Sequence, residues 1–270
     1  MLLRTPLSAT LPEGWLTWDS SHQGFLPISF AEGLKRLTHG GKPRHAGPIP
    51  PPGTVLPPLL PPFGGTKILA VGRNYRPHAA ELGNPVPEEP LWFSKPPSAL
   101  IGHDGVVILP TDVGQIDYEG ELAIVIGERC RNVRPEDALS KIAGVTLALD
   151  ITARTLQKKE GQWTRAKGFD TFCPLGPWIA AFHPGWLEAD LETWLNGRRV
   201  QADRLTSLIF PVPVLIAHLS RAMTLEPGDV LLTGTPAGVG PLAPGDRLEV
   251  RAAGPGQMRL AVTCRAENEV

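Results

Sequence analysis

The sequence is poor in cysteine, and this scarcity excludes two kinds of protein. Its three cysteines, Cys130, Cys173 and Cys264, are scattered along the chain and form no CxxC pair. An odd number without paired spacing argues against a disulfide framework and against a zinc site built from thiolates. The pattern is typical of a reducing compartment, so we expect a cytoplasmic protein.

The sequence also lacks long apolar runs and an excess of charge of either sign. No apolar stretch approaches the roughly 20 residues that a membrane-spanning helix needs. The first residues, MLLRTPLSATLPEG, have no sustained apolar stretch like that of a signal peptide. With 26 basic and 27 acidic side chains, the formal net charge is −1. This balance gives no support for nucleic-acid or membrane-surface binding, so we expect neither partner.

Glycine and proline, in contrast, are abundant, with 29 and 30 residues. They lie between short apolar runs, which favours a β-rich fold with many turns over a helical bundle. We expect a small N-terminal region or arm over residues 1–65, with an amphipathic helix at Phe30–Thr38 and a proline-rich linker at Pro48–Pro52 and Pro57–Pro62. Residues 66–270 then form the main domain.

Local signals predict several elements of the main domain. Asn196-Gly197 between two apolar runs predicts a β-hairpin, and Pro213–Ala222 predicts a helix. Pro-Gly-Asp occurs at 227–229 and 244–246, and we interpret the two as paired turns of one β-roll. The charged, poorly periodic segment 157–171 is the best candidate for a mobile loop or lid.

Two glutamates two residues apart are the most informative feature of the chain. In a strand, residues two apart share one face, so Glu119 and Glu121 project in the same direction beside the apolar run Ala123–Ile126. A second apolar strand, Val145–Leu149, ends in Asp150. Three converging carboxylates suit a hard cation, namely Mg²⁺, Mn²⁺ or Ca²⁺, with open positions for substrate. The residues alone leave open a solvated strand edge with an unrelated aspartate.

A histidine and a glutamate three residues apart form a second candidate. The segment Asn74–Gly83 reads as a short helix with Asn74 as N-cap and Gly83 as its stop. On such a helix His78 and Glu81 face the same side, where the carboxylate can orient an imidazole that accepts a proton from water. A surface helix with an ordinary ion pair remains the alternative.

Two further residues are candidates for substrate contact. Lys167 lies in the presumed lid, where an ammonium can meet a carboxylate or a developing enolate, although loop lysines are usually solvated. Thr235 lies in the glycine-rich run 233–240, which lacks the ending of a phosphate loop and the fingerprint of a dinucleotide fold. Its amides and hydroxyl can hold a carboxylate, and a plain turn is equally compatible.

Taken together, several segments resemble the fumarylacetoacetate hydrolase family, specifically its compact members. The resemblance extends over about residues 67–264. The matching segments keep the order of the family and are Val71–Tyr75 with His78 and Glu81, Phe93–Pro96, Ile101–Gly102, Asp117–Leu122, Asp150–Arg154, Ala166–Asp170 and Thr233–Pro236. The chain departs from the family pattern at Pro77, where relatives often carry a polar residue.

The resemblance implies a fold, an assembly and a site. The fold is mixed α/β and β-rich, a mixed β-sandwich roll with few short helices, and the protein is a homodimer. The implied site has three parts: a divalent metal held by Glu119, Glu121 and Asp150, a catalytic dyad of His78 and Glu81 with Lys167, and substrate contacts from Arg73, Tyr75, Lys167 and Thr235.

The implied activity is metal-dependent chemistry on a small 2-oxo or 2-hydroxy-dienoic diacid through a metal-stabilised enolate. We favour a 2-hydroxyhepta-2,4-diene-1,7-dioate isomerase or 5-oxopent-3-ene-1,2,5-tricarboxylate decarboxylase of aromatic catabolism. The alternatives are an acylpyruvate or fumarylpyruvate hydrolase that cleaves a C–C bond, and an oxaloacetate decarboxylase. A non-catalytic, calcium-stabilised β module is an alternative of another class.

Overall fold

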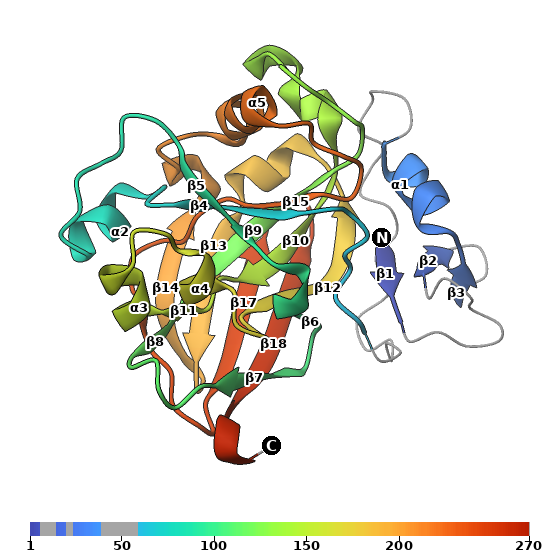
Figure 1. Cartoon of the computed structure of the whole chain (residues 1–270). Coiled ribbons are helices and arrows are strands. Elements are labelled where there is room, and N and C mark those ends of the chain that lie inside the picture. Colours follow the sequence, from blue (N-terminus) through green and yellow to red (C-terminus); the bar gives the residue numbers. More distant parts are fainter. Residues whose placement is uncertain (6–14, 20–23, 39–58, 270) are drawn as a thin grey trace.

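Two packed β-sheets form the body of the protein in a computed structural model that describes residues 1–5, 15–19, 24–38 and 59–269 (Figure 1). The larger sheet has ten strands among the described residues, in the order β3-β2-β1-β12-β10-β9-β15-β4-β5, with β6 added beside β12. The bounds of its strands are β1 Leu2–Arg4, β2 Trp15–Asp19, β3 Gly24–Pro27, β4 Ile68–Gly72, β5 Leu91–Lys95, β6 Leu100–Ile101, β9 Gly120–Ile126, β10 Ile142–Leu149, β12 Cys173–Ala181 and β15 Val230–Leu232.

Two smaller sheets complete the strands. A five-stranded sheet has the order β14-β13-β17-β18-β7, and a three-stranded sheet has the order β11-β8-β16. Their bounds are β7 Gly105–Leu109, β8 Ile116–Tyr118, β11 Thr152–Ala153, β13 Asp190–Leu195, β14 Arg198–Arg204, β16 Gly240–Pro241, β17 Arg247–Ala253 and β18 Gln257–Ala266.

The helices are short and lie around the sheets (Figure 1). The α-helices are α1 Phe30–Thr38, α2 Arg76–Glu81, α3 Arg154–Lys159, α4 Thr164–Lys167 and α5 Val212–Ala222. Short 3-10 helices occur at Pro97–Ala99, Pro135–Lys141, Pro184–Glu188, Leu205–Ser207 and Glu267–Glu269. No helix among the described residues is long and apolar enough to cross a membrane. The expected class, mixed α/β and β-rich with few helices, is confirmed.

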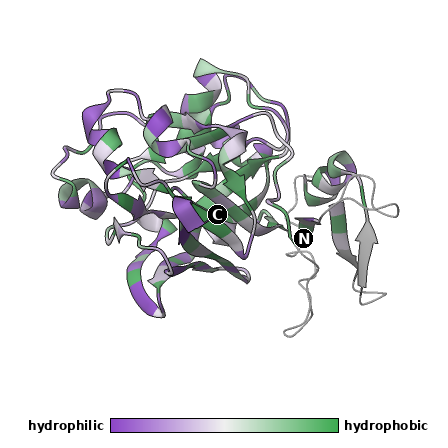
Figure 2. Ribbon diagram, turned by 60° about the horizontal axis from the view of Figure 1, so that its bottom comes forward, coloured by the Kyte–Doolittle hydropathy of each residue, from purple (hydrophilic) through white to green (hydrophobic). Residues whose placement is uncertain are grey.

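The central strand β9 shows why the two large sheets pack together. It is buried along its whole length, as its apolar sequence predicts. Leu122, Ile124 and Ile126 join the core that faces the five-stranded sheet, whereas Ala123 and Val125 join a second core on the other face. This alternation follows from the two-residue period of a strand. Figure 2 shows the apolar residues gathered on these inner strands and the hydrophilic residues on the outer helices and loops.

The chain changes sheets at the acidic residues. The strand expected around Glu119 is divided there, because β8 belongs to the three-stranded sheet and β9 to the large one. Asp150 lies at the matching point between β10 and β11, and its amide donates to the Glu119 carbonyl at 2.9 Å. The paired strands β9 and β10 of the large sheet therefore continue as the paired strands β8 and β11 of the three-stranded sheet. Glu119 and Asp150 lie where the chain passes from one sheet to the other, which we call the strand crossing.

Three local predictions need comment. The helix at Phe30–Thr38 and the Asn196-Gly197 hairpin are confirmed, with φ of 51° and 79° at the two turn residues. The pairing of the two Pro-Gly-Asp turns is wrong, because 227–229 leads into β15 of the large sheet and 244–246 into β17 of the five-stranded sheet. The two Pro-Gly-Asp turns have the same sequence because each places its glycine, Gly228 or Gly245, at a positive φ of 87°.

The N-terminal region joins the large sheet through its described strands. β1 pairs with β12 at Leu2 and Ile179, and β2 and β3 extend that edge. Most of the predicted proline-rich linker lies outside the described residues. The division of the chain near residue 65 stays a prediction.

Candidate metal centre and active site

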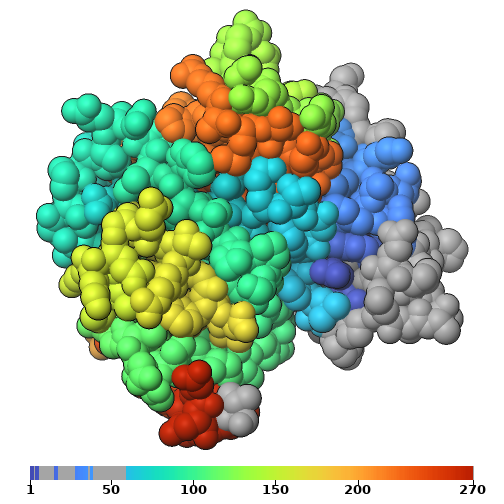
Figure 3. Space-filling view, viewed as in Figure 1, coloured from blue at the N-terminus to red at the C-terminus, as the bar shows by residue number. Residues whose placement is uncertain are grey.

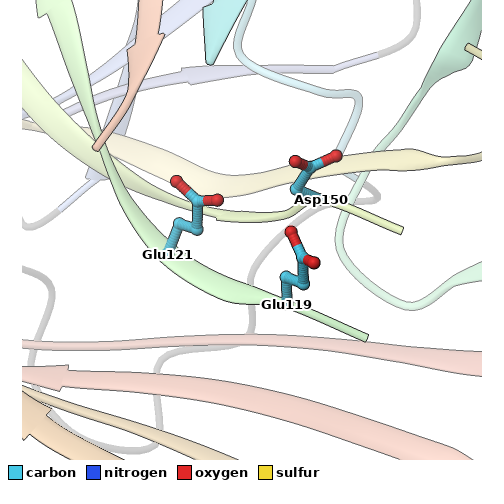
Figure 4. Close-up of side chains that lie close together, drawn as sticks. All are labelled: Glu119, Glu121 and Asp150. Atoms are coloured by element: carbon cyan, nitrogen blue, oxygen red, sulfur yellow. The ribbon is translucent and has the colours of Figure 1, made fainter. Parts of the chain in front are cut away.

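The three predicted carboxylates lie together at the strand crossing (Figure 4). Each of Glu119, Glu121 and Asp150 offers one oxygen, and these oxygens lie within 4.8 Å of one another. All three side chains are buried. The two glutamates approach each other as expected, although Glu119 lies between β8 and β9 rather than within one continuous strand, and the aspartate follows β10, the antiparallel partner of β9.

Cations surround two of the three carboxylates. Lys167 Nζ donates to Glu119 Oε2 at 2.8 Å and to Asp150 Oδ2 at 2.6 Å. Lys95 Nζ donates to the other oxygen of Asp150 at 2.6 Å. Arg154 donates to Glu119 Oε1 at 2.6 Å and also to Asp117 at 2.8 Å. Burial favours the neutral form of Glu119, but Lys167 and Arg154 outweigh it and hold its pKa well below the usual range.

Glu121 differs from its neighbours because no described cationic side chain forms an ion pair with it. Its Oε2 accepts from the Gly234 amide at 2.5 Å. Burial, together with the Asp150 and Glu119 carboxylates, raises its pKa well above 4.5. The site thus combines two carboxylates that are paired with cations and a third, Glu121, that is not. A divalent cation that prefers oxygen ligands would neutralise this excess negative charge, so the donor set fits Mg²⁺ or Mn²⁺. Glu119, Glu121 and Asp150 would hold the ion.

The predicted dyad lies beside this triad. His78 is buried on α2, and its Nδ1 lies 3.5 Å from Glu81 Oε2, which is longer than a formed hydrogen bond. Both Glu81 oxygens accept from the Gly238 amide at 3.1 Å, so the glycine-rich run that follows Thr235 holds the carboxylate in place. Burial lowers the pKa of His78 below 6.5, which keeps the ring neutral and able to accept a proton.

We expect the acid limb of kcat/KM to lie below pH 6.5 if neutral His78 is the base. The lowered pKa of His78 also affects stability. The unfolded chain binds this proton more readily than the folded chain, so the free energy of unfolding falls as the pH drops below 6.5. A pH–rate profile at saturating metal checks the limb. His78→Asn should remove it, whereas His218→Asn, on α5, should not. An acid limb above 6.5 in the wild type would contradict this role.

A cavity of about 300 Å³ reaches two of the three carboxylates. His78 and the two glutamates line it, as do the more exposed residues Arg73, Lys158 and Trp163. It lies between α2 and the α3–α4 segment, which are the teal and yellow surfaces side by side in Figure 3. Its size suits a small organic acid.

Residues 67–263, which include all of these groups, match a protein-family profile described as Fumarylacetoacetate (FAA) hydrolase C-terminal. The chain belongs to the fumarylacetoacetate hydrolase family.

Family relatives with a stated activity differ in their chemistry. A 2-hydroxyhepta-2,4-diene-1,7-dioate isomerase from Mycobacterium marinum is 34% identical, with a TM-score of 0.75 over 96% of each chain. A maleylpyruvate hydrolase from Sphingobium, solved with manganese(II) and pyruvate, is 36% identical, with a TM-score of 0.66 over 77% of this chain and 74% of that one. A mitochondrial oxaloacetate decarboxylase from Dictyostelium discoideum is 46% identical over 191 residues, 67% of this chain and 86% of the relative. These members of the fumarylacetoacetate hydrolase family are enzymes.

In this family member, two short helical pieces lie within the segment predicted to be a lid, and the mobility of that segment stays a prediction. Residues 157–159 form the end of α3 and residues 164–167 form α4, and Lys167 is 2% exposed. The lysine is therefore a buried partner of the carboxylates rather than a solvated loop residue. Its ion pairs with Glu119 and Asp150 offset the cost of burying the charge, and its ammonium also lies 4.9 Å from the centre of the Phe93 ring.

The predicted substrate contacts occupy different positions. Arg73 and Thr235 line the cavity, and the Thr235 hydroxyl donates to the Gly120 carbonyl at 2.9 Å. Tyr75 is fully buried, does not line the cavity, and its hydroxyl has no hydrogen-bond partner among the described residues. The substrate roles of all three residues stay predictions.

Gln201 is a site-supporting residue that sequence reasoning missed. It is buried on β14 and accepts from the Gly120 amide at 3.0 Å. Its amide nitrogen donates to Thr235 Oγ1 at 2.9 Å and to the Pro236 carbonyl at 2.7 Å. The side chain thus joins the metal-binding strand to the glycine-rich run. A polar residue in a strand of alternating exposure gives no signal of such a role.

Asn74 also has a role other than the one predicted. It does not cap α2, whose N-cap is Tyr75 without a side-chain hydrogen bond. Instead, fully buried, it donates to the Thr233 carbonyl at 2.8 Å and exchanges hydrogen bonds with the backbone of Phe210. The asparagine therefore fixes the run that carries Gly234 and Thr235. Gly83, with φ of 66°, does follow the end of the helix as predicted.

Proposed function

We propose that the protein is a divalent-metal-dependent enzyme that acts on small 2-oxo or 2-hydroxy-dienoic diacids, as a 2-hydroxyhepta-2,4-diene-1,7-dioate isomerase or 5-oxopent-3-ene-1,2,5-tricarboxylate decarboxylase. The observation that carries this proposal is the buried triad, in which Glu121 forms no ion pair with any cationic side chain that the structure describes. The isomerase branch is favoured because the mycobacterial isomerase matches this chain over 96% of both lengths.

The chain's own residues supply the other parts of the reaction. A divalent cation at the triad would supply Lewis-acid stabilisation of enolate charge on the substrate. Lys167, with its ammonium between Glu119 and Asp150, contributes a second positive charge at the same place. His78 moves a proton between solvent or substrate atoms, and the Glu81 carboxylate, 3.5 Å from its Nδ1, is placed to orient the ring once the two groups close to hydrogen-bond distance. The buried walls of the cavity keep bulk water from the developing charge.

The second candidate is an acylpyruvate hydrolase. The observation that favours it is the position of buried His78 in the cavity that Glu119 and Glu121 also line, where the imidazole can activate a water molecule for attack on a distal carbonyl. The Sphingobium relative, solved with manganese(II) and pyruvate, has this type of activity. Oxaloacetate decarboxylation is a third outcome and needs no attacking water.

A panel of substrates tests the proposal. The protein with Mg²⁺ or Mn²⁺ is given a 2-hydroxydienedioate, fumarylpyruvate and oxaloacetate, and the loss of enol or diene absorbance is followed with product analysis. We expect turnover of the dienedioate that stops with a chelator and returns with metal. Turnover of fumarylpyruvate alone would select the hydrolase. If none reacts and only Ca²⁺ raises the melting temperature, the enzyme proposal fails.

His78→Asn separates the branches further. Hydrolysis should fall by about a hundredfold or more, the scale of general base catalysis, whereas metal-assisted decarboxylation should continue. The homodimer implied by the family resemblance is also part of the proposal, and sedimentation velocity at micromolar concentration tests it.

A further inference from the structure

The charged residues in and beneath the cavity form two groups: a deep group of buried residues around the triad, and an outer group of the more exposed lining residues Arg73 and Lys158. The deep cations are all engaged by carboxylates: Lys95 and Lys167 by Asp150, and Arg154 by Glu119 and Asp117. With Glu121 included, four buried carboxylates meet three cations there. The deep end therefore has no spare positive charge for a second anionic group of a ligand.

The outer group consists of two cations without a carboxylate partner. Arg73 and Lys158 line the same cavity, and neither forms an ion pair with any residue that the structure describes. Lys158 lies in the last turn of α3, one position from Gln157, which also lines the cavity. Two positive charges that line one cavity together with Glu119 and Glu121 would attract an anion to it.

Arg73 is held in place by the fold. Its backbone has φ of 56°, an uncommon conformation for a residue with a side chain. Its guanidinium lies 5.7 Å from the centre of the Trp163 ring. A Cβ on Gly72 would meet that ring at 2.7 Å, so the indole packs directly against the backbone beside the arginine. These contacts orient the guanidinium while leaving its charge without a carboxylate.

We propose that Lys158, together with Arg73, forms a subsite for the second carboxylate of the substrate and sets a preference for diacids over monoacids. This inference rests on the proposed function, in which the first carboxylate and the 2-oxo group lie at the triad. Lys158 is the specificity-determining residue of the pair, because its exposed side chain forms no ion pair with a described residue, whereas Arg73 also lies against the Trp163 ring.

A matched pair of ligands tests the subsite. The probes are 2-oxoadipate and 2-oxohexanoate, which have equal carbon chains and differ by the terminal carboxylate, and their affinities are measured by calorimetry on the full chain with Mg²⁺. We expect the wild type to prefer the diacid by about tenfold, the scale of one hydrogen bond to a charged group. Lys158→Met should remove most of this preference, and Lys158→Arg should keep it.

Lys159→Met is the matched control, since Lys159 is the next residue of α3, also exposed, and does not line the cavity. It should keep the preference of the wild type. The subsite is overturned if Lys158→Met keeps the diacid preference, if Lys159→Met loses it equally, or if the wild type binds both acids alike. If neither acid binds with Mg²⁺, the proposed function fails and this inference fails with it.

Discussion

Glu121→Gln should abolish divalent-metal binding and lower turnover by more than about a hundredfold, which exceeds the usual cost of altering a residue that merely supports a metal ligand. The metal-free protein should keep its fold. The raised pKa of Glu121 means that the folded chain holds this proton more tightly than the unfolded chain, so its contribution is present at low pH and lost as the pH rises. Glutamine resembles the neutral acid and can still accept from Gly234.

Calorimetric titration with Mg²⁺ or Mn²⁺ and a thermal melt without metal check the two parts of this prediction. Glu128→Gln is the control, because Glu128 pairs with Lys141 at the surface, away from the cavity. It should leave both metal affinity and turnover unchanged. Metal affinity in Glu121→Gln equal to that of the wild type would contradict the ligand assignment, whatever happens to stability.

Lys167→Met should destabilise the metal-free protein by about 3 to 5 kcal/mol, the usual cost of removing one partner from a buried ion pair. The ammonium lies between Glu119 and Asp150, and the substitution leaves these buried carboxylates with one cation fewer. A divalent cation at the triad neutralises the same carboxylates. We therefore expect Mg²⁺ to stabilise the variant more than it stabilises the wild type, while turnover stays low.

Urea unfolding with and without Mg²⁺ measures both quantities. Lys141→Met is the control, because the ion pair of Lys141 with Glu128 is partly exposed, and its loss should cost less than about 1 kcal/mol. If Lys167→Met lowers the free energy of unfolding by less than about 1 kcal/mol, or if Mg²⁺ stabilises variant and wild type equally, the lysine does not offset the negative charge of the triad.

The parts of the fold and site that could be predicted were those set by short-range rules. The turn at Asn196-Gly197 depends on two residues that accept positive φ, and the common direction of Glu119 and Glu121 follows from strand period. The helix at Phe30–Thr38 follows from its amphipathic pattern. Each of these signals lies within about ten residues of sequence.

The parts that could not be predicted depend on contacts between distant segments. Arg154 reaches back to Glu119, 35 residues earlier, and Lys95 reaches forward 55 residues to Asp150. Asn74 carries a local capping signal, but the carbonyl of Thr233, 159 residues away, takes its side chain. Local propensity cannot predict this hydrogen bond, because the Thr233 carbonyl comes close to Asn74 only after the strands have paired.

The crossing of two paired strands at the acidic residues has a consequence for how this chain can diverge. Opposite Asp117 stands Thr152, and opposite Gly120 stands Leu149, so inserting or deleting one residue between these points would turn a carboxylate to the wrong face. At Gly161, in the connection between α3 and α4, an added side chain would meet nothing within 4 Å. We therefore expect substitutions and changes of length to be better tolerated at this point than at the strand crossing that carries the carboxylates.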